Sequence, residues 1–174
     1  MSRISFTEVA SQPDAADQVA YEVLFGSIPG VDRSRPLTIA CLNVSMPGSS
    51  NEAFTVTQHG HTRNFRGRRM NGTQFTITFV EDSNHDVQRR LLKWKEIVAG
   101  FESGNSQGYL RDYSVLCQII SYDTTGRVAA RRNVEETFIQ DVPEITHDGS
   151  SSAALNISAT FKCSRAYFTD IPLL

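Results

Sequence analysis

The chain has 174 residues, of which 40% are hydrophobic and 21% are charged, so it is long enough for one domain with a core and short for two. Its formal net charge of −2 argues against a general nucleic-acid coat, which is normally basic. No apolar run approaches the roughly 18 residues of a membrane span, and residues 1–12 lack the apolar region of a signal peptide, so we expect a cytosolic protein without a membrane partner.

The first quarter of the chain predicts an arm followed by two strands. Residues 1–18 are polar and rich in Ala, Asp and Gln, which predicts an N-terminal arm that packs only where a partner provides a surface. Residues 19–174 are predicted to form a single domain. In it, residues 21–25 alternate as a strand does, and residues 37–44 predict a second strand that ends at Met46-Pro47-Gly48.

Residues 45–72 have little core character, apart from a short strand expected at residues 54–58. A loop of this length inside a compact domain indicates a functional role. It contains the basic run Arg63-Asn64-Phe65-Arg66-Gly67-Arg68-Arg69, which could bind nucleic acid through its cations and its phenylalanine. We favour a solvated or partner-facing hairpin, because the chain as a whole is acidic.

Residues 73–101 carry the clearest periodicities of the sequence. Phe75, Ile77 and Phe79 alternate with polar residues, which predicts a strand buried on one face. A helix at about residues 84–99 follows, with an apolar stripe of Val87, Leu91, Trp94, Val98 and Phe101. Ser83 is the expected N-cap and Gly100 the expected C-cap. The opposite helix face is basic and carries Arg89, Arg90, Lys93 and Lys95.

The last part of the chain predicts further strands. A loop at residues 103–108 precedes a strand at 113–122 that is apolar on both faces and ends in a hairpin turn at 123–126. The partner strand lies within 128–142, where Glu135-Glu136 interrupts the alternation and predicts an edge or a bulge. After a loop at 146–152, residues 155–163 form the last strand. The fold class is therefore mainly β, an antiparallel sandwich or barrel with one packed helix.

Motifs for catalysis and for cofactors are missing from the sequence. It has no Gly-rich phosphate loop, no Gly-x-Ser-x-Gly elbow and no Cys-x-x-Cys pair. Cys41, Cys117 and Cys163 are expected to be small buried hydrophobes. His59 and His61, on one side of a strand, would make half of a metal site that no local motif completes, so a surface or turn role is favoured. We expect no catalytic residues, no cofactor and no metal.

The run from Phe75 to Gly100 resembles the strand-to-helix segment of tail-tube proteins from contractile-tailed bacteriophages. In that family an alternating strand leads through a turn like Glu81-Asp-Ser-Asn-His-Asp86 into a helix that ends in Trp-x-x-Ile-x-x-Gly, here Trp94 to Gly100. The resemblance extends in order from about Tyr21 to Phe168. It implies a structural virion protein that forms stacked hexameric rings, the inner tube of a contractile tail.

The resemblance also implies partners and contact residues. The partners are further copies of the chain, the sheath protein, baseplate and tail-terminator proteins, and the tape-measure protein and DNA that pass through the lumen. The protein would be made in the host cytoplasm and reside in the virion tail. The loop at 45–72 would reach the adjacent ring through Arg63, Phe65, Arg66, Arg68 and Arg69. Arg89, Arg90 and Lys93 would turn outward toward the sheath.

Two predicted strands have polar faces with almost no charge, and these faces are candidates for the wall of the channel. Their residues are Gln74, Thr76 and Thr78 on one strand and Asn156, Ser158 and Thr160 on the other. A wall without cations would let a polyanion slide without ion pairing. Lys162 departs from this pattern.

Other functions stay open at the level of the sequence. The same fold serves baseplate rings that initiate a tube and the inner tubes of related injection machines, including type VI secretion. A nucleic-acid-binding β-barrel that uses the basic run around Phe65 is the alternative from a different class.

Overall fold

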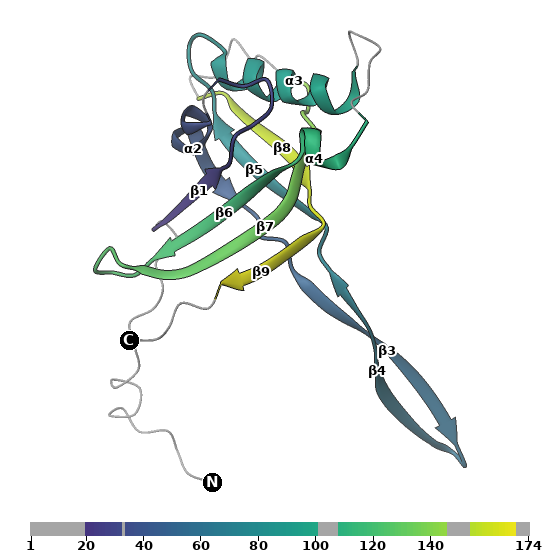
Figure 1. Ribbon diagram of the computed structural model, residues 1–174. Helices are drawn as coiled ribbons and strands as arrows, with labels where there is room; N and C mark the ends of the chain where they lie inside the picture. The colour runs from purple at the N-terminus through teal and green to yellow at the C-terminus, as the bar shows by residue number, and fades with distance from the viewer. Residues whose placement is uncertain (1–19, 33, 101–107, 146–153, 170–174) are drawn as a thin grey trace.

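The computed structural model describes residues 20–32, 34–100, 108–145 and 154–169. Antiparallel strands dominate this part of the chain, which confirms the mainly β fold class (Figure 1). Three helices accompany the strands within the described residues: α2 (Arg35–Ala40), α3 (Asp86–Ala99) and α4 (Leu110–Tyr113). None of these helices is long and apolar enough to cross a membrane.

One strongly curled sheet forms the body of the protein. Its strands run in the order β1 (Tyr21–Phe25), β6 (Val115–Tyr122), β7 (Val128–Asp141), β8 (Asn156–Lys162), β5 (Gln74–Val80) and β2 (Cys41–Val44), and β9 (Arg165–Thr169) also pairs with β7. The two ends of this order approach each other, and the Tyr21 hydroxyl of β1 donates to the carbonyl oxygen of Leu42 in β2 at 2.7 Å. The sheet is therefore a nearly closed barrel.

A β-bulge in β7 lets this strand serve both halves of the barrel. Val115 of β6 pairs with Thr137 but Cys117 pairs with Val134, so two residues of β7 stand opposite one of β6. Glu136 has a φ of 52° there. Before the bulge β7 pairs with β9, and after it with β8. The interruption at Glu135-Glu136 is thus confirmed as a bulge, and it turns the strand as bulges do.

The core lies inside the curled sheet and is closed at one end by α3 (Figure 1). Phe75, Ile77 and Phe79 of β5 are at most 3% exposed, as their alternation predicts. Trp94 of α3 is fully buried, and its ring centroid lies 5.6 Å from that of Phe161 in β8. The apolar stripe of α3 is confirmed by the burial of Val87, Leu91 and Trp94.

The cysteines in the structure are unpaired. Cys117 and Cys163 are buried hydrophobes, as expected, and Cys41 is half-buried. Burial raises the pKa of Cys41 to about 11. At neutral pH this thiol is therefore protonated and a poor nucleophile.

Two sequence predictions about elements were wrong in part, and one strand was missed. Residues 37–44 are not one strand, because the short helix α2 occupies the first half, with a proline in its first turn. The strand expected at 113–122 starts at Val115, after α4, and its second face is only partly covered since Leu116 is 44% exposed. The strand β9 was not predicted. Four predicted features fall wholly or largely outside the described residues: the arm at 1–18, Phe101 and the loops at 103–108 and 146–152.

Candidate assembly surfaces

A long two-stranded hairpin leaves the body between β2 and β5 and projects away from the barrel (Figure 1). It consists of β3 (Ser49–Gln58) and β4 (His61–Asn71), which pair only with each other. The tip is the two-residue turn His59-Gly60, in which both residues have positive φ, 49° and 79°. A turn of this kind matches the twist of two antiparallel strands. The expected loop is therefore an ordered hairpin, and its first strand is longer than residues 54–58.

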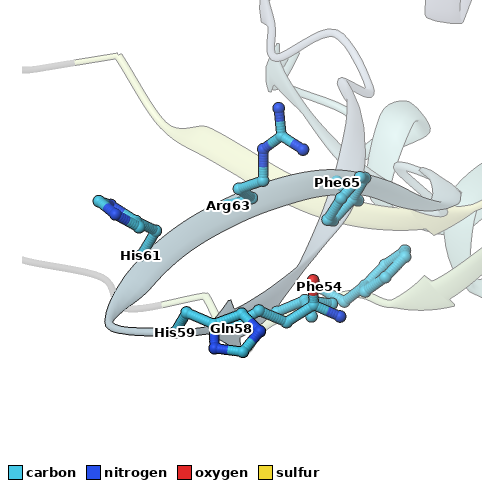
Figure 2. A pocket seen from close by; sticks show the side chains of 7 residues that line it. Phe54, Gln58, His59, His61, Arg63 and Phe65 are labelled. Atoms are coloured by element: carbon cyan, nitrogen blue, oxygen red, sulfur yellow. The ribbon is translucent and has the colours of Figure 1, made fainter.

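The hairpin has two chemically different faces near its tip. We call the first the aromatic face; it consists of Phe54, Val56, Gln58, His61, Arg63 and Phe65, which with His59 line one concave surface (Figure 2). The Phe54 and Phe65 rings stack with their centroids 5.5 Å apart, yet their side chains remain 54% and 43% exposed. An exposed aromatic pair of this kind indicates a contact surface.

The opposite face, which we call the threonine face, consists of Thr55, Thr57, Thr62 and Asn64. The Thr55 hydroxyl donates to Oδ1 of Asn64 at 2.9 Å, and the hydroxyls of Thr57 and Thr62 lie 3.3 Å apart. These residues pair across the strands, so their side chains share one side of the ribbon. These four side chains are uncharged and satisfy part of their own hydrogen bonding, and Arg66 lies beyond them on the same side of the ribbon.

The basic run of the sequence is divided between the two faces. Arg63 and Phe65 belong to the aromatic face, whereas Arg66 pairs with Ala53 on the side of the threonine face. Arg68 is exposed next to a register shift between Asn51 and Ala53. Arg69 lies in the β4 ladder, and its side chain is outside the described part of the structure. The hairpin thus brings these five candidates to one projection but not to one surface.

The two histidines do not lie on one strand, so the arrangement considered for half of a metal site was wrong, whereas the favoured surface or turn role is confirmed. His59 is in the turn, with its backbone in the left-handed region, and His61 begins β4. Within the described residues, no group of three His, Cys, Asp or Glu side chains could hold a metal ion.

The base of the hairpin is held by contacts that sequence reasoning missed. The Gly72 amide donates to the carbonyl oxygen of Gly48 at 2.6 Å, and a Cβ at Gly72 would lie 2.5 Å from that oxygen. Nη1 of Arg132 in β7 donates to the carbonyl oxygen of Pro47 at 3.2 Å, and its guanidinium lies 4.2 Å from the ring centroid of Phe168. Partial burial lowers the pKa of Arg132. Only the fold brings these residues together, so no local sequence signal marks them.

The uncharged side chains expected to face a channel lie together on the outer face of β5 and β8. Thr76 pairs with Thr160, and Thr78 pairs with Ser158. The hydroxyl oxygens of Thr78 and Ser158 are 2.9 Å apart. Gln74 pairs with Lys162, and Asn156 pairs with Val80. The strip is therefore polar and uncharged except at Lys162, which occupies one end.

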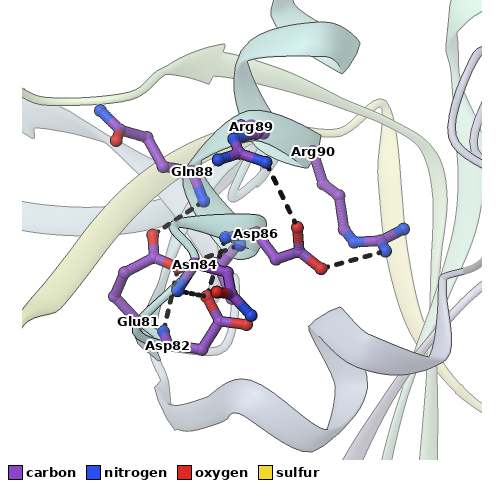
Figure 3. Close-up of polar contacts among 8 residues, drawn as sticks. Glu81, Asp82, Asn84, Asp86, Gln88, Arg89 and Arg90 are labelled. Atoms are coloured by element: carbon purple, nitrogen blue, oxygen red, sulfur yellow. Dashed lines mark hydrogen bonds and ion pairs between the residues drawn. The ribbon is translucent and has the colours of Figure 1, made fainter.

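Two carboxylates cap the start of α3 (Figure 3). Glu81 accepts hydrogen bonds from the backbone amides of Val87 at 3.0 Å and Gln88 at 2.9 Å. Asp82 accepts from the amides of Asn84 and Asp86, and the bond from Asp86 is the main reason that the pKa of Asp82 is lowered. The expected cap at Ser83 was wrong. The helix starts at Asp86, and longer side chains upstream reach its free amides instead.

The outer face of α3 carries the basic residues that were expected there. The Arg89 side chain is 72% exposed and Lys93 is also exposed, whereas the Arg90 side chain is 25% exposed and lies 3.6 Å from Asp86. Lys95 instead forms a 3.0 Å ion pair with Asp141 that links α3 to β7. Gly100 ends the helix in a left-handed conformation, as predicted. Arg89 and Lys93 are therefore the accessible cations of this helix.

The described residues form a curled antiparallel barrel with one packed helix and a projecting hairpin. The chain matches the family model for phage tail tube proteins over residues 5–168, and it therefore belongs to the phage tail tube protein family.

Known structures share this fold. The sheath/tube terminator of an extracellular contractile injection system, PVC, has a TM-score of 0.65 and 13% identity, covering 91% of this chain and 99% of that one. The anti-feeding prophage tube-terminating cap has a TM-score of 0.64 and 10% identity, with 92% and 95% covered. A chain of the PVC sheath-tube complex has a TM-score of 0.62 and 12% identity, with 97% and 100% covered. No curated protein matches the sequence.

Proposed function

We propose that the chain is the repeating subunit of an inner tail tube, in which six-membered rings stack inside a contractile sheath and DNA passes through the channel during ejection. The observation that carries this proposal is the family match over residues 5–168, together with a fold like that of a chain in a sheath-tube complex. The protein would be made in the host cytoplasm, reside in the virion tail and catalyse no reaction. Its partners would be further copies, the sheath, the baseplate, the terminator and the tape-measure protein.

Electron microscopy of the purified chain at rising concentration, beside a gel shift with DNA, tests this role. Hollow stacked rings without DNA affinity are the expected result. Monomers that shift DNA would contradict it and favour a nucleic-acid-binding module. The DNA affinity of such a module would fall steeply with salt, and Arg68→Glu would abolish its binding to DNA.

A second candidate is a ring that occurs once per tail, at the terminator or at the baseplate. It is favoured by the structures of similar fold, which include a tube terminator at a TM-score of 0.65 and a chain of a baseplate at 0.62. The same micrographs separate the two functions. A repeating subunit gives tubes that lengthen with concentration, whereas a single-copy ring gives rings of constant height.

The outer face of β5 and β8 is our candidate for the channel wall. Its paired threonines, serine and asparagine supply hydrogen-bonding groups without positive charge, so a passing polyanion would find no ion-pairing partner except near Lys162. Replacing Thr76 and Thr160 by lysine should leave tubes intact and make them bind DNA. Charged tubes that still ignore DNA would contradict this assignment.

The exposed cations of α3 are our candidate contact with the sheath. Arg89 and Lys93 project from the outer side of the helix, while Glu81 and Asp82 hold its first turn in place. A double change to glutamate at Arg89 and Lys93 should abolish sheath binding to preformed tubes. The matched control is Arg111→Glu, since this arginine side chain is 82% exposed but lies on α4. Equal sheath binding by both variants would refute the assignment.

A further inference from the structure

The hairpin presents an unburied aromatic pair, and this pair identifies which of its faces makes the contact between rings. We propose that the aromatic face docks on the body of a second copy of this chain, while the threonine face remains in water in the assembled tube. This inference rests on the proposed function and adds to it the orientation of the hairpin at the interface.

Leaving the aromatic face exposed to water is unfavourable. Phe54 and Phe65 already stack on each other, but about half of each side chain remains in water. Val56 and Arg63, which pair with each other next to the two rings, extend the same surface. A lone two-stranded hairpin is only marginally stable in water, so packing this face against another surface would stabilise the hairpin as well as the contact. Aromatic and arginine side chains at a patch of this kind are the usual centres of binding energy.

Another copy of the chain is the partner that suits the aromatic face. The hairpin projects away from its own barrel, and its extensive contacts are those between its own two strands (Figure 1). Its own body therefore does not cover the aromatic face in the described structure. The hairpin carries four arginines and one glutamate, a formal charge of +3, which leaves −5 on the rest of the chain because the whole chain is −2. The rest of a second copy, taken over its whole sequence, is thus opposite in net charge to the hairpin.

The threonine face, in contrast, favours water over a protein contact. Thr55 bonds to Asn64, and Thr57 lies beside Thr62, so these side chains have partners within the hairpin. Burying them in an interface would remove hydroxyl groups from water and bury only the small methyl groups of the threonines in return. A face of this composition suits water and matches the uncharged outer face of β5 and β8.

Paired alanine variants of the full chain test the assignment. Replacing Phe54 and Phe65 together should raise the concentration at which tubes form by about tenfold or more, as expected for hot-spot residues. Replacing Thr57 and Thr62 together is the matched control on the other face, and it should change that concentration less than about threefold. Tube formation is followed by light scattering and electron microscopy. Because the aromatic face lies outside the barrel, the circular dichroism melting curve of the body should be the same in both variants.

The outcomes separate this inference from the function on which it rests. If the unmodified chain forms tubes and the phenylalanine variant forms them equally well, the docking face is refuted and the tube function stands. If the threonine variant is the one that loses stacking, the hairpin docks through its other face and the inference is wrong. If the unmodified chain forms neither rings nor tubes, with or without its baseplate and sheath proteins, the proposed function itself fails and takes the inference with it. A steep salt dependence of stacking that Arg63→Gln reduces would support the charge argument.

Discussion

Replacing Trp94 by alanine is the change that the structure predicts to be most damaging to the body of the protein. The side chain is fully buried, and its ring lies 6.2 Å from Phe25 and 5.6 Å from Phe161 between ring centroids. Its indole nitrogen donates to the carbonyl oxygen of Tyr113 at 2.9 Å, which ties α3 to α4. Truncation of a buried tryptophan costs about 3–5 kcal/mol of unfolding free energy. We expect that loss for Trp94→Ala.

Two further variants separate packing from hydrogen bonding at this position. Trp94→Phe keeps an aromatic ring but removes the hydrogen-bond donor to Tyr113. Loss of this hydrogen bond should lower the unfolding free energy by about 1 kcal/mol, in addition to the effect of the smaller ring. Leu92→Ala is the surface control on the same helix, because Leu92 is 45% exposed, and it should cost less than about 1 kcal/mol. Urea denaturation followed by far-ultraviolet circular dichroism measures all three. A loss below about 1 kcal/mol for Trp94→Ala would show that α3 is not anchored in the core.

Other predictions concern the helix cap and the base of the hairpin. Glu81→Gln should destabilise the protein by about 0.5–2 kcal/mol in urea denaturation, because a charged cap of two helix amides becomes neutral; an unchanged midpoint would contradict this. The pKa of Asp82 is lower in the folded state, so the stabilising effect of this carboxylate is complete above its ordinary pKa and is lost as pH falls through the folded value. Hydrogen exchange at the Asp86 amide should therefore accelerate below about pH 4. An exchange rate that does not change with pH, after correction for the intrinsic rate, would argue against this. Gly72→Ala should disrupt the base of the hairpin, since the new methyl group meets the facing backbone, and unchanged amide chemical shifts around the base would refute this. Arg132→Ala should broaden the distance distribution between spin labels on the hairpin tip and the body, while an unchanged distribution would show that this arginine does not orient the hairpin.

The sequence predicts best where one period runs through a whole element. The strand β5 and the helix α3 each bury one side against the same core. For β5 the alternation of Phe75, Ile77 and Phe79 predicts this side, and for α3 the helical stripe through Trp94 does, so local pattern and tertiary packing agree. The bulge at Glu135-Glu136 could also be predicted, because two adjacent carboxylates cannot both continue an alternating buried strand.

Other elements depend on contacts between distant residues and have no local signal. Residues 37–44 are apolar on both sides, which fits a short helix and a strand equally, and the packing of Leu37 in the core decides for the helix in the first half. The division of the basic run between two faces of the hairpin is fixed by its cross-strand register, which follows from the turn at His59-Gly60. Arg132 is 85 residues from Pro47, so only the folded barrel joins them.

A cryo-electron microscopy reconstruction of the assembled chain tests the central claim most directly. We expect a hollow tube of stacked six-membered rings, with the outer face of β5 and β8 on the channel and each hairpin reaching the adjacent ring through Phe54 and Phe65. Assemblies without a channel, or a chain that stays monomeric at every concentration with and without its baseplate and sheath proteins, would contradict it.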